Sequence, residues 1–272
     1  MLKQRILTAL ILIPLVVLAI LYLPTTTLML LFAVVLGLAA WEWSRIAGWQ
    51  ETAGQLFYVA AMALILWDLN IFLMQQADRM QIFLWVAAAW WLLALFLVWQ
   101  YQFSKITQLI NARWLKSLMG FLILLPTWFA LSHLHQSRGG DWLLFLLVLI
   151  WTADSGAYFA GRRWGKHKLA KRVSPGKTWE GVAGAVVSSL LLTLLWLWWS
   201  NLAMPAALWL LLLSVLTVLA SILGDLLESL FKRQTGIKDS SQLLPGHGGI
   251  LDRIDSLTAA APIFVLGLGF IL

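Results

Sequence analysis

The chain has 272 residues, of which 61% are hydrophobic and 11% charged, and its mean hydropathy is +0.86. This composition excludes a soluble globular domain and indicates an integral membrane protein. Cysteine is absent, which excludes disulfides, zinc–thiolate centres and thiol nucleophiles. The net charge of +7 is interpreted from where the basic residues fall in the membrane topology, and we expect no nucleic-acid partner.

Apolar runs long enough to cross the hydrocarbon core begin directly after the basic start MLKQR. The first run is as long as a spanning helix and no small-residue cleavage site follows it, so we interpret it as a transmembrane helix rather than a signal peptide. Unbroken apolar runs also favour helices over a barrel, whose strands alternate apolar with polar residues. The sequence therefore predicts an all-α polytopic integral membrane protein with about nine transmembrane helices, at residues 6–23, 28–43, 56–74, 82–100, 117–135, 142–160, 182–199, 206–224 and 257–272.

The basic residues predict the orientation, because short loops rich in Lys and Arg stay in the cytoplasm. With a cytoplasmic N-terminus and nine alternating spans, 17 of the 19 Lys and Arg residues fall inside, and only Arg79 and Arg138 fall outside. Both large polar segments, 161–181 and 225–256, then emerge on the cytoplasmic face. They are separated by two spans and can therefore form one site.

The first polar segment follows a predicted span that contains Asp154, where an unpaired carboxylate would be costly, so we expect a cation or a basic partner. The sequence SPGKT within it invites a P-loop interpretation, but Lys171 stands where that motif needs glycine. Attraction of this basic loop to anionic lipid headgroups is an alternative explanation for any single lysine. The candidate phosphate contacts that remain are Ser174, Lys177 and Thr178.

The second polar segment, 225–256, carries two pairs of carboxylates. Asp225 and Glu228 are three residues apart at the end of one predicted span, and Asp252 and Asp255 repeat this spacing just before the next. A three-residue spacing places both side chains of a pair on one helical face. Hard oxygen ligands beside basic residues suit Mg²⁺ and phosphate, so we predict a magnesium site here.

Glycines fill the loop between these pairs. Gly246, Gly248 and Gly249 permit close approach and unusual backbone angles, so that peptide N–H groups can surround an anion. His247 could contact a phosphate or hold the loop in place. A loop that is merely solvated, with charges that follow the positive-inside rule, is the alternative interpretation.

Two further acidic residues lie near or within spans. For Glu42 and Asp68 we favour intramembrane pairing with structural roles over a substrate path.

The run SLFKRQTGIKDSSQLLPGHGGILDRID, residues 229–255, resembles the signature of the phosphatidate cytidylyltransferases, also called CDP-diacylglycerol synthases. The segment from Asp154 through SPGKTWEG is similar to a second region of that family. The two regions cover about the last 120 residues. We therefore divide the chain into N-terminal transmembrane helices, 1–140, and a C-terminal catalytic region, 141–272, whose cytoplasmic loops are 161–181 and 225–256.

The resemblance implies a membrane enzyme of phospholipid biosynthesis that joins CTP to phosphatidic acid and releases pyrophosphate. It also implies a homodimer and a Mg²⁺ centre on Asp225 and Asp252, to which a monovalent cation could be added. Further candidate metal ligands are Glu228, Asp255 and Asp154. The candidate catalytic side chains are Asp225, Asp252, Lys232, Arg233, His247 and Arg253, and the candidate substrate contacts are Ser174, Lys177, Thr178, Lys238, Gly246, Gly248 and Gly249.

We expect the protein in a bacterial cytoplasmic (inner) membrane, with its site facing the cytoplasm. One alternative is a CTP-dependent lipid kinase of the polyprenol or phytol type, which would give a phospholipid and CDP. Another is an ion-coupled transporter, which would spread polar residues along several spans rather than at one face.

Overall fold

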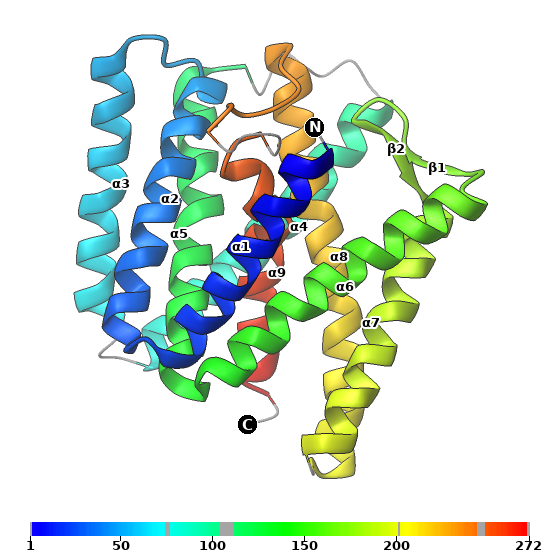
Figure 1. The fold of residues 1–272 in the computed structure, drawn as a ribbon. Helices are drawn as coiled ribbons and strands as arrows, with labels where there is room; N and C mark the ends of the chain where they lie inside the picture. The colour runs from blue at the N-terminus through cyan, green and yellow to red at the C-terminus, as the bar shows by residue number, and fades with distance from the viewer. Residues whose placement is uncertain (1, 74–76, 104–110, 201, 244–247, 271–272) are drawn as a thin grey trace.

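A computed structural model describes residues 2–73, 77–103, 111–200, 202–243 and 248–270. Within these residues the chain forms nine helices and one short hairpin (Figure 1). The elements are α1 (Leu2–Tyr22), α2 (Thr25–Ala47), α3 (Thr52–Leu73), α4 (Ala77–Phe103), α5 (Arg113–Arg138), α6 (Gly140–Trp164), β1 (Lys168–Ala170), β2 (Ser174–Thr178), α7 (Trp179–Ser200), α8 (Met204–Thr235) and α9 (Leu251–Leu268).

Each of the nine predicted spans falls on one of these helices, which confirms the all-α class. Seven helices, α2 to α8, are long and apolar enough to cross a bilayer in the part of the chain that the structure describes. The apolar part of α1, Leu10–Tyr22, is shorter. Helix α9 starts with charged residues and continues as a buried helix among the others, where its Ser256 and Thr258 are also enclosed.

Helix α8 continues for eleven residues beyond its predicted end at residue 224, so the expected loop 225–256 begins as helix. Leu226, Leu227, Leu230 and Phe231 extend its buried face at helical spacing, and their burial favours the continued helix. The helix ends at Gly236, whose φ of 73° is left-handed and whose N–H bonds to the Arg233 carbonyl.

The basic segment 161–181, predicted as a loop, contains the antiparallel hairpin β1–β2. Ala170 and Val173 of this hairpin are buried. At its end the Thr178 hydroxyl accepts a hydrogen bond from the Gly181 N–H at 3.1 Å, which caps the start of α7. The hairpin is therefore a fixed extension of α6 and α7.

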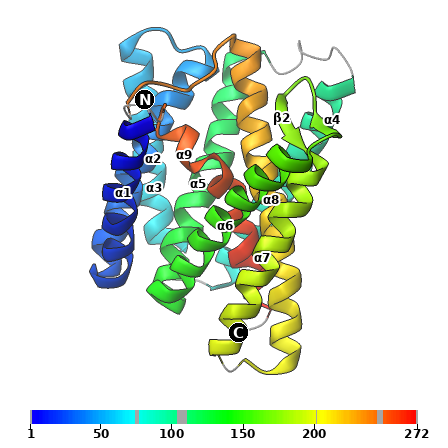
Figure 2. The same cartoon turned by 45° about the vertical axis from the view of Figure 1, so that its right-hand side comes forward.

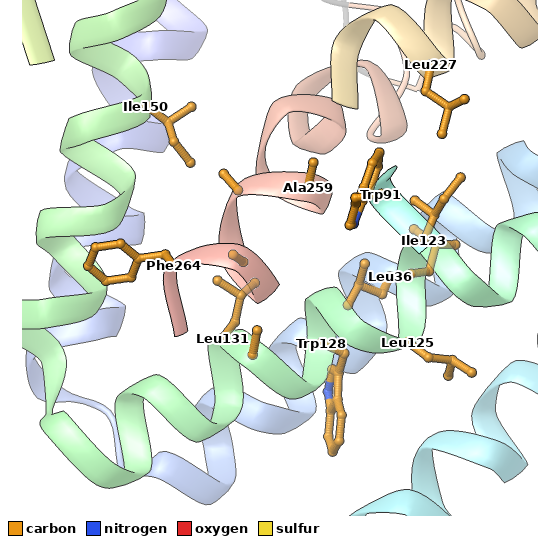
Figure 3. Packing of buried hydrophobic residues seen from close by; sticks show 14 of the residues in the cluster. Leu36, Trp91, Ile123, Leu125, Trp128, Leu131, Ile150, Leu227, Ala259 and Phe264 are labelled. Carbon is orange, nitrogen blue, oxygen red and sulfur yellow. The ribbon is translucent and has the colours of Figure 1, made fainter. Parts of the chain in front are cut away.

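The core gathers around α5 and α9. Figure 3 shows Trp91 of α4, Ile123 of α5 and Ala259 of α9 meeting in the interior. Pro262 lacks an N–H and so leaves the carbonyl of Thr258 without its helical donor. Thr127 of α5 donates its hydroxyl to that carbonyl at 3.1 Å, so the two central helices are joined where one of them is interrupted.

Helices α6 and α7 pack through small residues. A Cβ placed on Gly184 would clash with the Ala160 side chain and would lie 2.6 Å from the Gly156 carbonyl oxygen. The Ser188 hydroxyl donates to the Thr152 carbonyl across the same seam. Close backbone approach of this kind is typical of helix pairs in membranes.

The N-terminal end of α1, the hairpin and the segment between α8 and α9 all lie at the same end of the bundle, as both views show (Figures 1 and 2). The basic residues predicted alternating spans that bring the N-terminus and both polar segments to one face, and this arrangement is therefore confirmed. The two polar segments meet at this end, which we call the polar end.

We expect Gly184→Ala to lower the melting temperature of the purified protein, because overpacking a closed seam costs about 1–3 kcal/mol. Gly37→Ala is the matched control. A Cβ there meets no atom within 4 Å, and alanine improves the helix by up to about 1 kcal/mol. Thermal unfolding can be followed by tryptophan fluorescence, and equal melting temperatures for the two variants would contradict the close packing.

Candidate active site

One face of α8 lines the site. Asp225, Glu228, Ser229 and Lys232 follow one another at intervals of three, one and three residues, so they lie on the same side of the helix. The last turns of α8 reach the polar end, where β2 and the start of α9 approach them (Figure 2).

Asp225 joins the hairpin to α8. Its Oδ2 lies 2.7 Å from the Lys177 ammonium of β2, and its Oδ1 accepts a hydrogen bond from the Ser229 hydroxyl at 3.1 Å. Directly before it, a Cβ on Gly224 would clash with the Asp255 carbonyl oxygen, so α8 and α9 touch backbone to backbone here. The two carboxylates of Asp225 and Asp255 are close enough to repel each other.

Asp252 forms a second pair. The Lys232 ammonium donates to Asp252 Oδ1 at 2.7 Å and lies 3.1 Å from Glu228 Oε1. The side chains of all three residues are largely buried, with exposed fractions of 6%, 12% and 4% for Asp252, Lys232 and Glu228. A lysine enclosed between two carboxylates stays charged and neutralises both in part.

The loop between α8 and α9 completes the shell around Asp252. Its carboxylate accepts hydrogen bonds from the Gly249 N–H at 2.7 Å, from the Ser240 N–H at 3.0 Å and from the Ser240 hydroxyl at 3.0 Å. Asp252 lies in the first turn of α9, outside the seven helices, α2 to α8, that are long and apolar enough to cross a bilayer. Burial alone would raise its pKa, but the Lys232 ammonium and the two N–H donors hold the pKa of this carboxyl below its usual value.

The described loop glycines make room for carboxylates. Gly248 has a φ of 83°, and a Cβ there would lie 2.7 Å from Asp252 Oδ2. A Cβ on Gly249 would clash with the Ser240 hydroxyl and would lie 2.6 Å from both Glu42 oxygens. We predicted N–H groups around an anion, and in this structure the Gly249 N–H binds the side chain of Asp252. Contact of these glycines with a substrate phosphate stays a prediction.

Glu42 is the residue whose role the sequence did not reveal. It was interpreted as a structural partner within the membrane, and it is fully buried on α2. Its carboxylate binds the hydroxyls of Ser240 and Ser241 and the N–H groups of Ile250 and Leu251. The one available signal was its place at the polar end of the second predicted span, where an acidic residue needs a partner.

Asp154 and Arg253 border the cluster. Asp154 of α6 is exposed on the surface of the isolated chain, and it interacts electrostatically with Lys177, Asp225 and Arg253. Asp154 forms no ion pair among the described residues, so its expected cation or basic partner stays a prediction.

The other predicted residues lie around this cluster. Arg233 is exposed and donates to the Val173 carbonyl at 3.3 Å, while Ser174 lies in β2 and the Thr178 hydroxyl is occupied by its cap of α7. Lys238 is exposed in the loop after α8. Gly246 and His247 lie outside the described residues. Direct contacts of all these groups with a substrate stay predictions.

The cluster has a surplus of negative charge. Among the described residues, the carboxylates of Asp225, Glu228 and Asp252 share the two ammonium groups of Lys177 and Lys232 within ion-pair distance, one positive charge fewer than the three carboxylates. Asp154 and Asp255 form no ion pair in the same part of the chain. Among the described residues, no group of three acidic or histidine side chains is arranged so that it could hold a metal ion. However, Glu228 Oε2 has no hydrogen-bond partner among the described residues despite its burial, and Oε1 has only the Lys232 ammonium at 3.1 Å. The charge deficit and the unsatisfied Glu228 oxygen fit a divalent cation.

An open cavity of about 980 Å³ lies on the other side of the loop. It runs between the end of α2 and the residues that follow α8, and its cationic side chains are Arg45 and Lys238. None of the clustered carboxylates lines it. Ser240 borders both the cavity and Asp252 and separates one from the other.

Comparison with known proteins gives a consistent result over the whole chain. Residues 3–271 match the model of a family described as "Cytidylyltransferase family". A "Phosphatidate cytidylyltransferase" of Pseudomonas aeruginosa is 48% identical over 265 residues, which cover 97% of this chain and 96% of the relative. A protein of the same name from Haemophilus influenzae is 42% identical over 282 residues and 97% of each chain. The similarity therefore includes the first 140 residues as well as the loop regions.

Proposed function

The chain belongs to the cytidylyltransferase family, and on this premise we propose that it condenses CTP with phosphatidic acid to give CDP-diacylglycerol and pyrophosphate. The names of the relatives that align over nearly the full chain support this reaction over that of a lipid kinase or a transporter. The observation that carries the proposal is the cluster of paired carboxylates and lysines at the polar end, where α8 and α9 meet.

The reaction brings two anions together. An oxygen of the phosphatidate phosphate attacks the α-phosphorus of CTP, and the bond from that phosphorus to the β-phosphate oxygen breaks as pyrophosphate leaves. The attacking phosphate is already ionised, so no general base is needed. Charge repulsion is the main barrier that the protein must lower.

Basic side chains of the cluster are suited to this task. Lys177 and Lys232 are held beside the carboxylates by ion pairs of 2.7 Å, and their ammonium groups would bind phosphate oxygens at the same place. Arg233 and Arg253 are exposed at the same end and can bind phosphate oxygens in a bidentate manner. Together these groups would neutralise the substrates and the leaving group.

A divalent cation fits the same cluster. We propose that Asp225 and Asp252 hold Mg²⁺, with Glu228, Asp255 and Asp154 within the same charged group. When bound, Mg²⁺ would supply positive charge to phosphate oxygens of both substrates. An additional monovalent cation stays a prediction.

The membrane position matches the substrates. Diacyl tails remain in the bilayer while the headgroup reaches the helix ends, and CTP arrives from water. The excess of Lys and Arg at the polar end supports a cytoplasmic site in the inner membrane of a bacterium. The homodimer implied by the sequence resemblance also stays a prediction.

We expect the purified full-length protein to transfer cytidine to lipid. Incubated with phosphatidic acid, Mg²⁺ and CTP labelled at the α-phosphate, it should give a labelled lipid on chromatography, and unlabelled pyrophosphate should be released. CTP labelled at the γ-phosphate should leave the lipid unlabelled. A labelled lipid only from the γ-labelled nucleotide would instead identify a kinase.

Asp225→Ala and Asp252→Ala should each lower the turnover by at least about 100-fold, because each removes a charge from the reacting centre. Asp68→Ala, an exposed carboxylate on α3, is the matched control and should keep normal turnover. Chelation of Mg²⁺ should stop the wild-type reaction and its return should restore it. Near-normal turnover in either site variant would refute the assignment of these carboxylates.

The cavity beside the loop offers space for the nucleotide. We expect Arg45→Ala and Lys238→Ala each to raise the KM for CTP by about tenfold or more, since a hydrogen bond to a charged group contributes about 1.5–3 kcal/mol. Arg138→Ala, at the opposite end of the bundle, serves as control. Initial rates at varied CTP concentration measure the effect, and an unchanged KM in both variants would exclude the cavity as a nucleotide site.

A further inference from the structure

A carboxylate from the N-terminal half of the chain lies beneath the loop of the site. Glu42 belongs to the last turns of α2, and its exposed fraction is 0%. Residues 240 and 250 to which it binds follow it by about 200 positions in the sequence. No basic side chain lies within ion-pair distance of it among the described residues. A buried charge of this kind must be stabilised by hydrogen bonds.

Four hydrogen bonds supply that stabilisation, two at each oxygen. Oε1 accepts from the Ser241 hydroxyl at 2.5 Å and from the Ile250 N–H at 3.0 Å. Oε2 accepts from the Leu251 N–H at 2.7 Å and from the Ser240 hydroxyl at 3.0 Å. The carboxylate therefore joins both ends of the loop between α8 and α9, and it also caps the first N–H groups of α9.

Ser240 links Glu42 to the site. Its hydroxyl oxygen lies 3.0 Å from Glu42 Oε2 and 3.0 Å from Asp252 Oδ2, so its single proton is shared between two carboxylates. Asp252 in turn binds the Lys232 ammonium at 2.7 Å. The chain of contacts thus runs from α2 through the loop to α9 and α8.

The backbone at Gly249 packs closely against this carboxylate. A Cβ on Gly249 would lie 2.6 Å from both Glu42 oxygens, so only glycine allows the contact. The same Gly249 donates its N–H to Asp252 at 2.7 Å. One peptide unit is therefore fixed between the two carboxylates, and a shift of Glu42 would move the donor of Asp252.

We infer that Glu42 is a positioning residue for the reaction: it sets the place of Asp252 and Lys232 through Ser240 and Gly249 and touches no substrate itself. This inference rests on the proposed function for its effect on turnover. The contacts assign a role in the active site to α2, which belongs to the region 1–140 predicted as N-terminal transmembrane helices. Misplacement of reacting groups by about 1 Å can cost about 100-fold in rate.

The variant Glu42→Gln tests the inference, because glutamine keeps the size but turns an NH₂ group toward donors that need an acceptor. We expect kcat to fall by about 100-fold, while the KM for CTP changes by less than about threefold, since an interaction lost only in the transition state lowers kcat. Ser44→Ala is the matched control. Ser44 is buried on the same helix, and among the described residues its hydroxyl bonds only within α2, to the Trp41 carbonyl at 2.7 Å.

A double-mutant cycle separates positioning from general destabilisation. If Glu42 acts through Ser240, the loss of kcat in Glu42→Gln combined with Ser240→Ala should be smaller than the product of the two single losses. Fully multiplicative losses would overturn this route. A normal kcat in Glu42→Gln, or an equal loss in Ser44→Ala, would overturn the positioning role.

Hydrogen exchange of the full-length protein gives a readout that does not depend on activity. In Glu42→Gln the amides of residues 248–256 should exchange faster, while those of α6 and α7 should not change. Unchanged exchange at 248–256 would overturn the inference even if turnover fell. If the wild-type protein makes no CDP-diacylglycerol, the proposed function fails, and this exchange experiment still decides whether Glu42 holds the loop.

Discussion

The repulsion between negative groups at the polar end is the constraint on which this structure depends. Carboxylates from α6, α8 and α9 come together beside apolar helices, where water cannot screen them fully. Lys177 and Lys232 balance part of that charge through ion pairs of 2.7 Å. The remaining deficit is the reason for our proposal of a divalent cation here, since uncompensated carboxylates would repel phosphate substrates.

Close helix packing creates this arrangement. Gly224 lets the backbone of α8 touch that of α9, which brings Asp225 near Asp255. Gly184 and Gly156 do the same for α7 and α6, whose connecting hairpin carries Lys177. Small residues therefore determine which charged groups meet, although they carry no chemistry themselves. The stability of these seams and the geometry of the site depend on the same contacts.

The loop between α8 and α9 is held from below by the N-terminal half of the chain. Glu42 binds its serines and the first N–H groups of α9, and Ser240 transmits this contact to Asp252. These contacts cross the predicted boundary at residue 140 between the N-terminal helices and the C-terminal catalytic region. The similarity to relatives over 97% of the chain is consistent with a site that needs helices from both halves.

The sequence by itself determined the membrane class, the nine helices of the described residues and the face at which each helix ends. Long apolar runs and basic loops are local properties of the chain, so they do not depend on how the helices pack. It also identified the carboxylates of α8 and α9, since the three-residue spacing fixes a shared helical face. The tertiary structure alone decided that Asp225 pairs with Lys177, that α9 is enclosed by other helices, and that Glu42 binds a loop about 200 residues away. These contacts join segments that are distant in the chain, and their partners are chosen by the close approach of helices, which no local pattern of residues encodes.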